Sequence, residues 1–580
     1  MSLRHHAVAV VLGLCAAACS PGAPATSPAP GGVAEGYNSG WSLRGKARIT
    51  EGASAVVVSG SPIASEVGRD ILRKGGNAVD AAVAVGFALA VVHPEAGNIG
   101  GGGFMVFRMA DGKAYALDYR ETAPAAATRD MYIEPDGDVA DLSLTGHLAA
   151  GVPGAPAGLV EAHRRFGKLP LADVLAPAIR LADDGYVVDD YRAESIGDYW
   201  ERLYLFPASR AQFLPNNRPP VPGTTLKQPD LGRTLAAIRD SGWAGFYRGR
   251  VADLIVAEME RGGGIITHGD LASYKALWRE PVTISYRGHT IYSMPLASSG
   301  GTTLAMILNI LEGFAPLPPF GTPALLHLEA EAMKRAFTDR NQYLGDPGFA
   351  KIPLDRLLSK DYAASQRATI KPDQATPTPK FDPSLRDGGS TTHYSVVDAE
   401  GNAVSTTTTL NDSYGSAVTV AGAGFLLNDT MDDFAAAPGK PNMYGLVQGE
   451  VNAIQPGKRM LSAMTPTIVV DSAGRLEMVV GTPGGPRIIT MVYHVISNVI
   501  DHGMTLQEAI EAPRMHHQAL PDSIRLERNG FQPATMTRLR TMGHGVYEGG
   551  RSGDIEAIIR VPGGWLGVSD PRLGGGGAGY

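Results

Sequence analysis

Cysteine is nearly absent from this sequence. Only two of the 580 residues are cysteine, Cys15 and Cys19, and both lie among the first 20. The rest of the chain therefore cannot contain a disulfide framework, a cysteine-ligated zinc site or a cysteine nucleophile.

An excess of positive charge is also missing. The chain has 51 Lys and Arg against 58 Asp and Glu, a formal net charge of −7 at pH 7, and no basic block stands out. We therefore expect no nucleic-acid partner. The hydrophobic content of 44% is close to the globular norm, which excludes disorder for most of the chain. The length predicts several domains or one large α/β body.

Glycine, in contrast, is abundant, with 72 residues or about 12% of the chain against a typical value of about 7%. Its densest run, at residues 97–103, superficially resembles a phosphate-binding loop. A strand-like Phe-Met-Val-Phe follows at residues 104–107, whereas nucleotide-binding glycine motifs lead from a strand into a helix. We therefore interpret the run as tight turns before a packed strand.

The amino terminus has the composition of an export signal. A polar start is followed by an apolar run at residues 7–18 that is too short to span a membrane. Residues 1–18 are predicted to be a signal peptide that resembles the bacterial lipoprotein type, with Cys19 lipidated. An ordinary export signal with a chance cysteine is the alternative. Residues 19–45 are rich in Pro, Ala, Gly and Ser, which predicts a tether. We expect a protein of the bacterial periplasm or cell envelope, attached to the membrane if Cys19 carries a lipid.

The body begins with alternating strand and helix signals. Residues 55–58 predict a strand and residues 65–74 a helix that stops at two glycines. Asn77 and Asp80 have the spacing of a capping box for an apolar, buried helix at residues 81–92. Residues 171–345 predict a mostly helical layer.

A proline-rich arm interrupts this pattern at residues 371–390, which we expect to be exposed and mobile. Two strands of a hairpin follow it directly, at residues 391–397 and 403–410. If the chain is cut between Ser390 and Thr391, Thr391 carries both a hydroxyl nucleophile and a free α-amine. That amine has an unperturbed pKa of about 7.7–8.0, so one residue can supply the nucleophile and its base.

Acyl transfer also needs hydrogen-bond donors for an oxyanion. Gly484 and Gly485 follow a predicted strand at residues 476–480, where successive backbone N–H groups can point to one place. Ordinary Gly-Gly turns are the alternative interpretation of this signal.

The motifs resemble those of the γ-glutamyltranspeptidase family, in order along the chain from about residue 50 to 580. They are residues 93–104, Leu-Asp-Tyr-Arg-Glu at 117–121, Thr-Thr-His-Tyr-Ser-Val-Val-Asp at 391–398, Gly-Asn-Ala-Val at 401–404, Met-Asp-Asp-Phe at 431–434, Pro-Gly-Gly at 483–485 and Ser-Asp-Pro-Arg at 569–572. The resemblance implies an α/β N-terminal-nucleophile hydrolase fold, a four-layer αββα sandwich. It also implies a proenzyme that cuts itself into a large fragment, residues 46–390, and a small catalytic fragment, residues 391–580, which stay associated. It implies neither a metal nor another cofactor.

The resemblance also implies a role for each matching residue. Thr391 matches the nucleophile, Thr409 its hydrogen-bond partner, and Gly484 and Gly485 the oxyanion donors. The residues that match the substrate pocket are Arg120 and Ser462 for the α-carboxylate, Asp433 and Asn411 for the α-ammonium, and Tyr444 in a lid loop at residues 438–452. A zwitterionic amino-acid head needs such a cation and anion, which we expect at opposite sides of it.

Two positions depart from the family pattern. Thr430 stands where relatives often have Gln or Glu at the ammonium, so we expect it to reach the substrate only through water. Ala463 replaces a serine beside Ser462 and removes one hydroxyl. His393, His516 and His517 have no metal-ligand spacing with a third group, and we interpret them as structural residues.

The implied activity is transfer of the γ-glutamyl group of glutathione or related γ-glutamyl amides to water, an amino acid or a dipeptide. One alternative is a cephalosporin (glutaryl) acylase of the same superfamily, whose substrates lack the α-ammonium that Asp433 would bind. An alternative of another class is a non-enzymatic, peptide-binding envelope lipoprotein.

Overall fold

A computed structural model describes residues 38, 40–378 and 390–580. The predicted signal peptide, Cys19 and most of the tether lie outside these residues, as does most of the proline-rich arm. The ordered body starts slightly earlier than predicted. The indole N–H of Trp41 donates to the Glu511 carbonyl at 2.7 Å, and Gly45 N–H donates to the Glu511 carboxylate at 2.6 Å.

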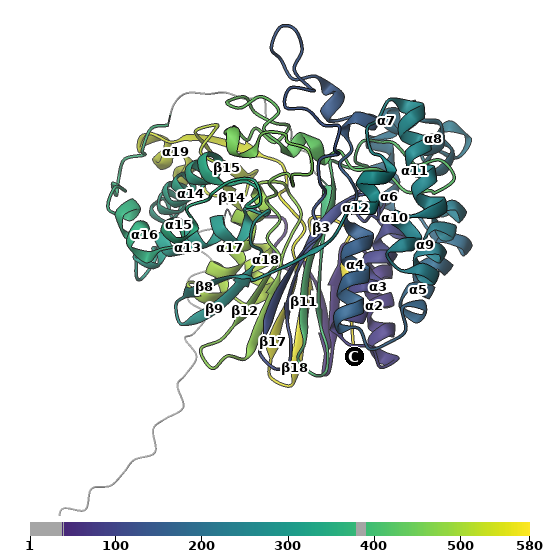
Figure 1. Ribbon diagram of the computed structural model, residues 1–580. Helices are drawn as coiled ribbons and strands as arrows, with labels where there is room; N and C mark the ends of the chain where they lie inside the picture. Colours follow the sequence, from purple (N-terminus) through teal and green to yellow (C-terminus); the bar gives the residue numbers. More distant parts are fainter. Residues whose placement is uncertain (1–37, 39, 379–389) are drawn as a thin grey trace, which may run out of the picture.

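Two seven-stranded sheets lie face to face between two layers of helices (Figure 1). The first sheet has the order β19-β2-β10-β11-β3-β4-β7 and the second β1-β18-β17-β13-β12-β9-β8, and every adjacent pair is antiparallel. This arrangement confirms the predicted four-layer αββα sandwich.

The strands of the first sheet are β2 (Val56–Ser59), β3 (Gly102–Arg108), β4 (Ala114–Asp118), β7 (Leu277–Arg279), β10 (Ser390–Val397), β11 (Ala403–Asn411) and β19 (Gly576–Gly579). Those of the second are β1 (Arg48–Gly52), β8 (Val282–Tyr286), β9 (His289–Ser293), β12 (Thr467–Val470), β13 (Leu476–Val480), β17 (Glu556–Val561) and β18 (Gly564–Ser569). Two small sheets complete the described set, β14 (Met515–His516) with β15 (Ser523–Glu527) and β16 (Gly545–Gly549), and β5 (Tyr186–Val187) with β6 (Thr225–Leu226).

The period of two along each strand explains why the first sheet is buried on both faces. On β2, Val57 packs into the core shared with the first helical layer, whereas Val56 and Val58 pack into the core between the sheets. On β3, Phe107 packs into the core shared with the first helical layer, and Phe104 packs into the core between the sheets.

The helices form two groups, on the right and left of Figure 1. The first comprises α2 (Pro62–Arg73), α3 (Ala78–Val92), α4 (Ala155–Phe166), α5 (Leu171–Asp184), α6 (Asp190–Asp198), α7 (Trp200–Leu205), α8 (Pro207–Phe213), α9 (Pro229–Ser241), α10 (Ala244–Tyr247), α11 (Gly249–Gly262) and α12 (His268–Ser273). The second comprises α13 (Gly300–Glu312), α14 (Pro323–Tyr343), α15 (Leu354–Leu357), α16 (Lys360–Arg367), α17 (Arg487–Ile500), α18 (Leu506–Glu511) and α19 (Pro533–Thr541).

The local predictions near the amino end are confirmed. Helix α3 is buried along its whole length, and Asn77 and Asp80 form the predicted capping box. The middle of the chain differs from the prediction of one helical layer. Its helices divide between both outer layers, and β7, β8 and β9 at residues 277–293 cross from one sheet to the other. These three strands are short and partly exposed, so they carry a weak hydrophobic pattern.

The described start of the proline-rich arm, residues 371–378, is held in place. Thr376 and Thr378 are hydrogen-bonded to Glu331 and Asp522 respectively, and the Ala375 N–H donates to the Met542 carbonyl. The contacts of Thr378 and Ala375 join this stretch to residues on the other side of the predicted cleavage point. The rest of the arm, residues 379–389, lies outside the described residues.

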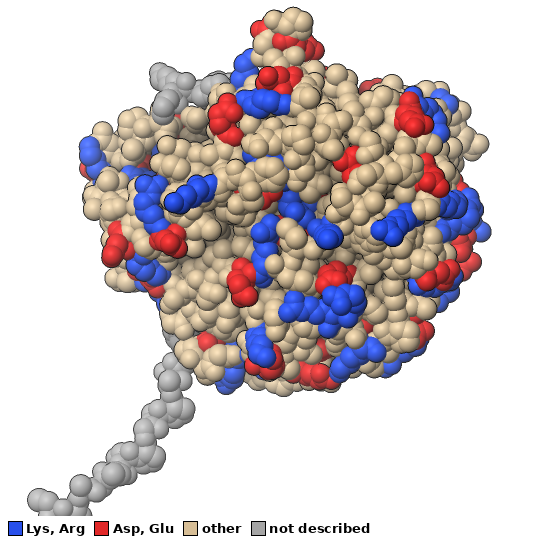
Figure 2. Space-filling model, viewed as in Figure 1, with Lys and Arg blue, Asp and Glu red and all other residues tan. Residues whose placement is uncertain are grey.

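No helix among the described residues is long and apolar enough to cross a membrane. On the face shown in Figure 2, basic and acidic side chains are interspersed.

Candidate active site

Thr391 lies near the start of β10, and its hydroxyl oxygen is 3.1 Å from that of Thr409 on β11. The antiparallel register pairs the two residues directly, so their side chains point to the same side of the sheet. The Thr409 oxygen also accepts the Asn411 N–H at 2.8 Å. The predicted partnership of Thr391 and Thr409 is therefore confirmed as a contact.

The strand pairing is irregular at the proposed cleavage point. Ser390 pairs with Asn411 and Thr391 with Thr409, so the register shifts between Ser390 and Thr391. Asn411 has a φ of 87°, in the left-handed region. Such irregularities end regular pairing and redirect side chains, and they are common next to active sites.

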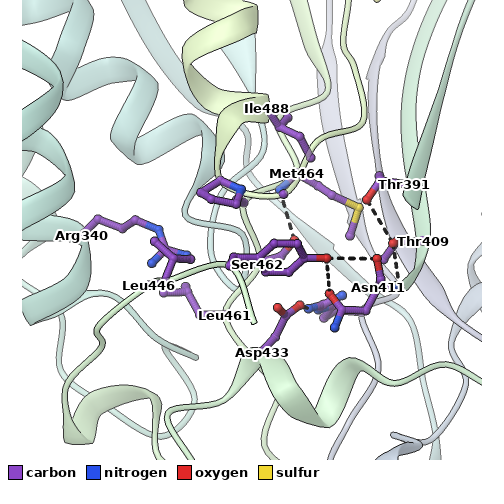
Figure 3. A pocket seen from close by; sticks show the side chains of 15 residues that line it. Arg340, Thr391, Thr409, Asn411, Asp433, Leu446, Leu461, Ser462, Met464 and Ile488 are labelled. Carbon is purple, nitrogen blue, oxygen red and sulfur yellow. Dashed lines mark hydrogen bonds and ion pairs between the residues drawn. The ribbon is translucent and has the colours of Figure 1, made fainter. Parts of the chain in front are cut away.

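A small pocket of about 20 Å³ opens beside the two threonines. Figure 3 shows their hydroxyls turned toward each other next to Asn411, with Arg340 and Leu446 on the opposite side. A cavity needs about 10–15 Å³ to hold one water molecule, so this pocket has room for about one. The predicted residues that line it are Thr391, Thr409, Arg120, Asn411, Asp433, Tyr444, Ser462, Ala463 and Gly485.

Arg120 and Asp433 form an ion pair inside the pocket. They contact each other, which differs from our expectation that they lie at opposite sides of a substrate. Arg120 is completely buried and is also 3.4 Å from Glu121, and its Nε donates to the Met460 carbonyl at 3.3 Å. The guanidinium is therefore shared between two carboxylates, and Arg120 also lines the pocket.

Burial dominates the protonation of both carboxylates. It raises the pKa of Asp433 more than Arg120 and Arg340 lower it. It raises the pKa of Glu121 to about 7, despite the opposing effect of Arg120. Burial also lowers the pKa of Arg120, but Glu121 and Asp433 more than compensate, so the guanidinium stays charged.

Tyr444 closes the pocket from the lid loop. Its hydroxyl is 3.0 Å from the Asn411 carbonyl oxygen and 2.9 Å from Asn411 Oδ1. The Tyr444 carbonyl accepts the Gln518 side-chain amide at 3.0 Å, so the residue is fixed at both ends. Its ring packs on Gly485, where an added Cβ would lie 2.9 Å from ring carbons.

The loop after β13 contains both predicted oxyanion donors. Gly484 has a φ of 134° and Gly485 a φ of 58°, and side chains are rarely compatible with either value. Gly485 lines the small pocket, and Gly484 lines a larger cavity that also reaches Thr391. Each glycine therefore lines a cavity that Thr391 also lines.

The residues of this pocket lie within a part of the chain that matches the model of a known protein family. The family model for Gamma-glutamyltranspeptidase matches residues 64–580. The chain belongs to the γ-glutamyltranspeptidase family.

The sequence similarity to individual members of the family extends along almost the whole chain. A glutathione hydrolase proenzyme of Escherichia coli (strain K12) is 46% identical over 98% of this chain and 97% of its own length. The proenzyme of Pseudomonas sp. (strain A14) is 48% identical over 90% of each chain. The acylase ACY 1 proenzyme of Pseudomonas sp. (strain V22) is less similar, at 40% identity over 82% of this chain and 86% of its own.

Solved structures support the same family fold. The cephalosporin acylase of Bacillus halodurans has a TM-score of 0.80 at 28% identity and covers 96% of this chain and 99% of its own. The Helicobacter pylori γ-glutamyltranspeptidase chain has a TM-score of 0.54 at 46% identity, and covers 55% of this chain and 91% of its own.

Thr430 does not reach the γ-glutamyltranspeptidase pocket. It is fully buried at the start of the short 3-10 helix Thr430–Asp433, and its hydroxyl donates to Asn428 Oδ1 at 2.6 Å. Thr430 is absent from the pocket lining, and its expected water-mediated contact with the substrate stays a prediction. Its short side chain bonds locally instead of extending inward.

The three histidines considered from the sequence are structural. Burial lowers the pKa of His393 to about 3, and its ring nitrogens contact Thr407 and Ser395. His516 bonds to Thr490 and Gln518, and His517 lies 3.3 Å from Asp522.

Another cluster was not anticipated. His327, Glu331 and His544 are close enough to share an ion, and form the one such group of three among the described residues. Glu331 is already paired with Arg335 at 2.6 Å and accepts two hydrogen bonds from Thr376. These contacts balance the carboxylate charge without an ion.

Sequence reasoning also missed Arg340 and Gln518. Arg340 is buried at the end of α14 and lines the pocket, and burial lowers its pKa to about 10. Its Nε donates to Ser299 Oγ at 3.0 Å. Both residues act through long-range contacts, and no local pattern in the sequence distinguishes them from surface residues.

Proposed function

We propose that this chain is an autoprocessing γ-glutamyltranspeptidase that also hydrolyses glutathione. The observation that carries the proposal is the 3.1 Å contact between Thr391 and Thr409 beside a pocket that contains Arg120 and Asp433. Family membership and the relatives named glutathione hydrolase proenzyme support it. A non-enzymatic lipoprotein would not need a buried threonine pair next to a closed, charged pocket.

Activation begins when Thr391 Oγ attacks the carbonyl carbon of Ser390. The peptide C–N bond breaks, an ester C–O bond forms, and the hydroxyl proton moves to the departing nitrogen. Water then hydrolyses the ester, which leaves a carboxylate on Ser390 and a free hydroxyl and α-amine on Thr391. Residues 46–390 and 391–580 are the proposed fragments.

In the mature enzyme the α-amine of Thr391 takes the proton from its own hydroxyl. Thr391 Oγ attacks the γ-carbonyl of the substrate, and the backbone N–H groups of Gly484 and Gly485 stabilise the oxyanion. The amine leaves with a proton, and a γ-glutamyl ester remains on Thr391. Water then releases glutamate, or an amino acid or dipeptide takes the acyl group through its amine.

Recognition of the γ-glutamyl head uses the ion pair inside the pocket. Arg120, with Ser462 nearby, would bind the α-carboxylate, and Asp433 with Asn411 would bind the α-ammonium. Because the two charges contact each other in the empty pocket, the zwitterion must insert between them. Tyr444 must also move, since the closed pocket holds about one water molecule.

An acylase acting on glutaryl amides remains the second candidate, supported by the acylase relatives. Asp433 argues against it, because a glutaryl group has no ammonium to replace the contact with Arg120 once the substrate separates the two residues. Comparing kcat/KM on a γ-glutamyl anilide and the matching glutaryl anilide distinguishes the two, and we expect the γ-glutamyl compound to be preferred.

Processing is tested on a denaturing gel with amino-terminal sequencing. We expect two bands, the smaller beginning at Thr391, that elute together in size-exclusion chromatography. Thr391→Ala should give one uncut band without activity. A fully active, uncut wild-type chain would overturn the proposal.

We further propose that the chain is exported and lipidated at Cys19, supported by the apolar run and small residues before that cysteine. Radiolabelled palmitate should be incorporated by the wild type and not by Cys19→Ser. Equal labelling of both would contradict lipidation at this residue.

A further inference from the structure

One cation that lines the small pocket has no carboxylate partner. Arg340 on α14 is 1% exposed, and among the described residues it forms no ion pair. The other two fully buried arginines of the described chain, Arg120 and Arg192, each pair with an aspartate. A buried charge without a partner costs folding free energy, and such costs are typical of functional sites.

Neutral groups hold the Arg340 side chain in place. Its Nε donates to Ser299 Oγ at 3.0 Å, and one terminal nitrogen, Nη1, donates to Asn341 Oδ1 at 2.9 Å. Gln448 Oε1 lies 3.4 Å from the same nitrogen. For the other terminal nitrogen, Nη2, the described residues provide no hydrogen-bond partner. The guanidinium is thus fixed in orientation while its charge stays uncompensated.

Two of these groups also hold the residues predicted to bind the amino-acid head of the substrate. Ser299 Oγ donates to the Ser462 carbonyl at 2.6 Å, on the predicted carboxylate side. Gln448 Nε2 donates to the Asp433 carbonyl at 3.3 Å, on the predicted ammonium side. Figure 3 shows Arg340 across the pocket from the two threonine hydroxyls. Arg340 is therefore connected to the residues that bind the head and lies away from the proposed nucleophile.

Arg340 acts on Asp433 through its charge. Burial raises the pKa of Asp433, and Arg120 and Arg340 both oppose this rise. Asp433 in turn opposes the lowering of the Arg340 pKa by burial. The other ionisable groups that face Asp433 are the Glu121 carboxyl and the Tyr444 hydroxyl, and neither can supply positive charge. Among the described residues, Arg340 is thus the cation that remains for Asp433 when Arg120 is engaged elsewhere.

We propose that Arg340 is a positioning residue that keeps Asp433 ionised while the substrate is bound. In the empty pocket Arg120 pairs with Asp433. Once the α-carboxylate of the substrate binds to Arg120, that pairing weakens, and the charge of Arg340 continues to favour the ionised form of Asp433. Asp433 then retains the negative charge that attracts the substrate ammonium. The inference rests on the proposed function and adds a residue that determines how strongly the site discriminates for an ammonium.

The missing carboxylate partner of Arg340 agrees with this role. A carboxylate at ion-pair distance would cancel most of the effect of the guanidinium on Asp433. Without one, the charge acts across the buried pocket, where the effective dielectric constant is lower than in water. An arginine that served only to stabilise the fold would be better paired.

The test measures the binding of L-glutamate and glutarate, which differ only in the α-ammonium. Isothermal titration calorimetry with the processed enzyme at pH 5.5 and pH 7.5 gives the Kd of each, and the wild type should bind L-glutamate more tightly. Arg340→Gln lets the pKa of Asp433 rise further, so more of this carboxylate is protonated as the pH falls. Its affinity for L-glutamate should therefore drop about three- to tenfold more at pH 5.5 than at pH 7.5. Glutarate should show no such added loss.

Two further variants isolate the charge. Arg340→Lys keeps it, and should bind both ligands with the wild-type dependence on pH. Arg356→Gln is the matched control, because Arg356 is an exposed arginine of α15 outside the pocket lining, and it should bind both ligands as the wild type does. Two co-eluting bands on a gel show that each variant is folded and cut. If Arg340→Gln is not cut, Arg340→Met replaces it.

Two outcomes would overturn the inference. Equal losses of affinity for L-glutamate and glutarate at both pH values would mean that Arg340 only shapes the pocket. A lysine variant that behaves like the glutamine variant would mean that its charge has no role. Failure of the wild type to release anilide from a γ-glutamyl anilide would instead refute the proposed function, so the two failures are distinguishable.

Discussion

Thr409 illustrates how much one hydroxyl can contribute. It contacts Thr391 Oγ and accepts the Asn411 N–H, so it orients the nucleophile and the residue next to the substrate together. Thr409→Val keeps the shape of the side chain but removes both interactions. We expect self-cleavage and turnover to slow about 10²-fold, in the range of a lost positioned proton-transfer partner.

The measurement is the time course of the two bands and the rate of anilide release. Thr406→Val on the same strand, outside the pocket lining, is the control and should be processed normally. Wild-type cleavage in Thr409→Val would contradict the role proposed for this hydroxyl.

In the proposed mechanism, the ammonium of the substrate separates Asp433 from Arg120, and Asp433 selects the acyl group. In Asp433→Asn the buried site loses its negative charge, and kcat/KM for the γ-glutamyl anilide should fall about 10²–10³-fold. Turnover of the glutaryl anilide should fall much less, because that substrate has no ammonium. An equal fall with both substrates would show that Asp433 supports the pocket without reading the ammonium.

At the scale of elements, the lid is joined to α17 by a chain of side chains. Thr490 on α17 contacts His516 Nδ1 at 2.9 Å, His516 Nε2 contacts Gln518 Oε1 at 2.9 Å, and the Gln518 amide donates to the Tyr444 carbonyl. Burial strongly lowers the pKa of His516, so the neutral ring sets the orientation of the Gln518 amide. Gln518 is therefore a positioning residue for the closed lid.

Gln518→Met keeps the volume but cannot donate to the lid. We expect faster hydrogen exchange in a peptide covering residues 438–449, and a KM for the γ-glutamyl anilide raised about three- to tenfold, since one hydrogen bond contributes about 0.5–1.5 kcal/mol. The kcat should change less than KM. Unchanged exchange and KM would mean that Tyr444 is held by Asn411 alone.

The elements also show where sequence reasoning succeeds. The capping box of Asn77 and Asp80, the strand after the glycine run and the hairpin at Thr391 depend on neighbours within a few residues, so the sequence predicts them. The assignment of β7–β9 to two different sheets depends on long-range pairing with β4 and β12, which no local pattern records.

The candidate site likewise has features that the sequence predicts and contacts that depend on long-range packing. The pocket residues were predicted through the family resemblance, and the structure brings them together, with Thr430 as the exception. The mutual pairing of Arg120 and Asp433 and the contacts of Arg340 and Gln518 depend on packing between residues far apart in the chain. Only coordinates reveal them.

At the scale of the whole molecule, stability should respond to pH through Glu329. This α14 carboxyl accepts the Tyr493 hydroxyl at 3.0 Å, and burial raises its pKa to about 8. In the unfolded chain it ionises near pH 4.5. The stability from the neutral group is thus fully present below about pH 4.5 and is lost as pH rises to about 8, by up to about 1.4 kcal/mol per pH unit.

Glu329→Gln cannot ionise and keeps an acceptor for Tyr493. We expect its melting temperature to exceed that of the wild type at pH 8 and to approach it at pH 5, measured by differential scanning fluorimetry. Glu400→Gln, a change at an exposed turn residue, should show no such trend with pH. A constant difference between Glu329→Gln and the wild type at both pH values would contradict the raised pKa.

Strand β19 is built from the last residues of the chain, yet it completes the sheet edge next to β2, and Tyr580 bonds to Ser54 and Ala55. Strand β2 in turn is the other neighbour of β10. Residues 576–579 therefore help to complete the sheet around the proposed scissile bond, although they lie far from it in sequence. A variant that lacks them would lose the strand at this edge of the sheet.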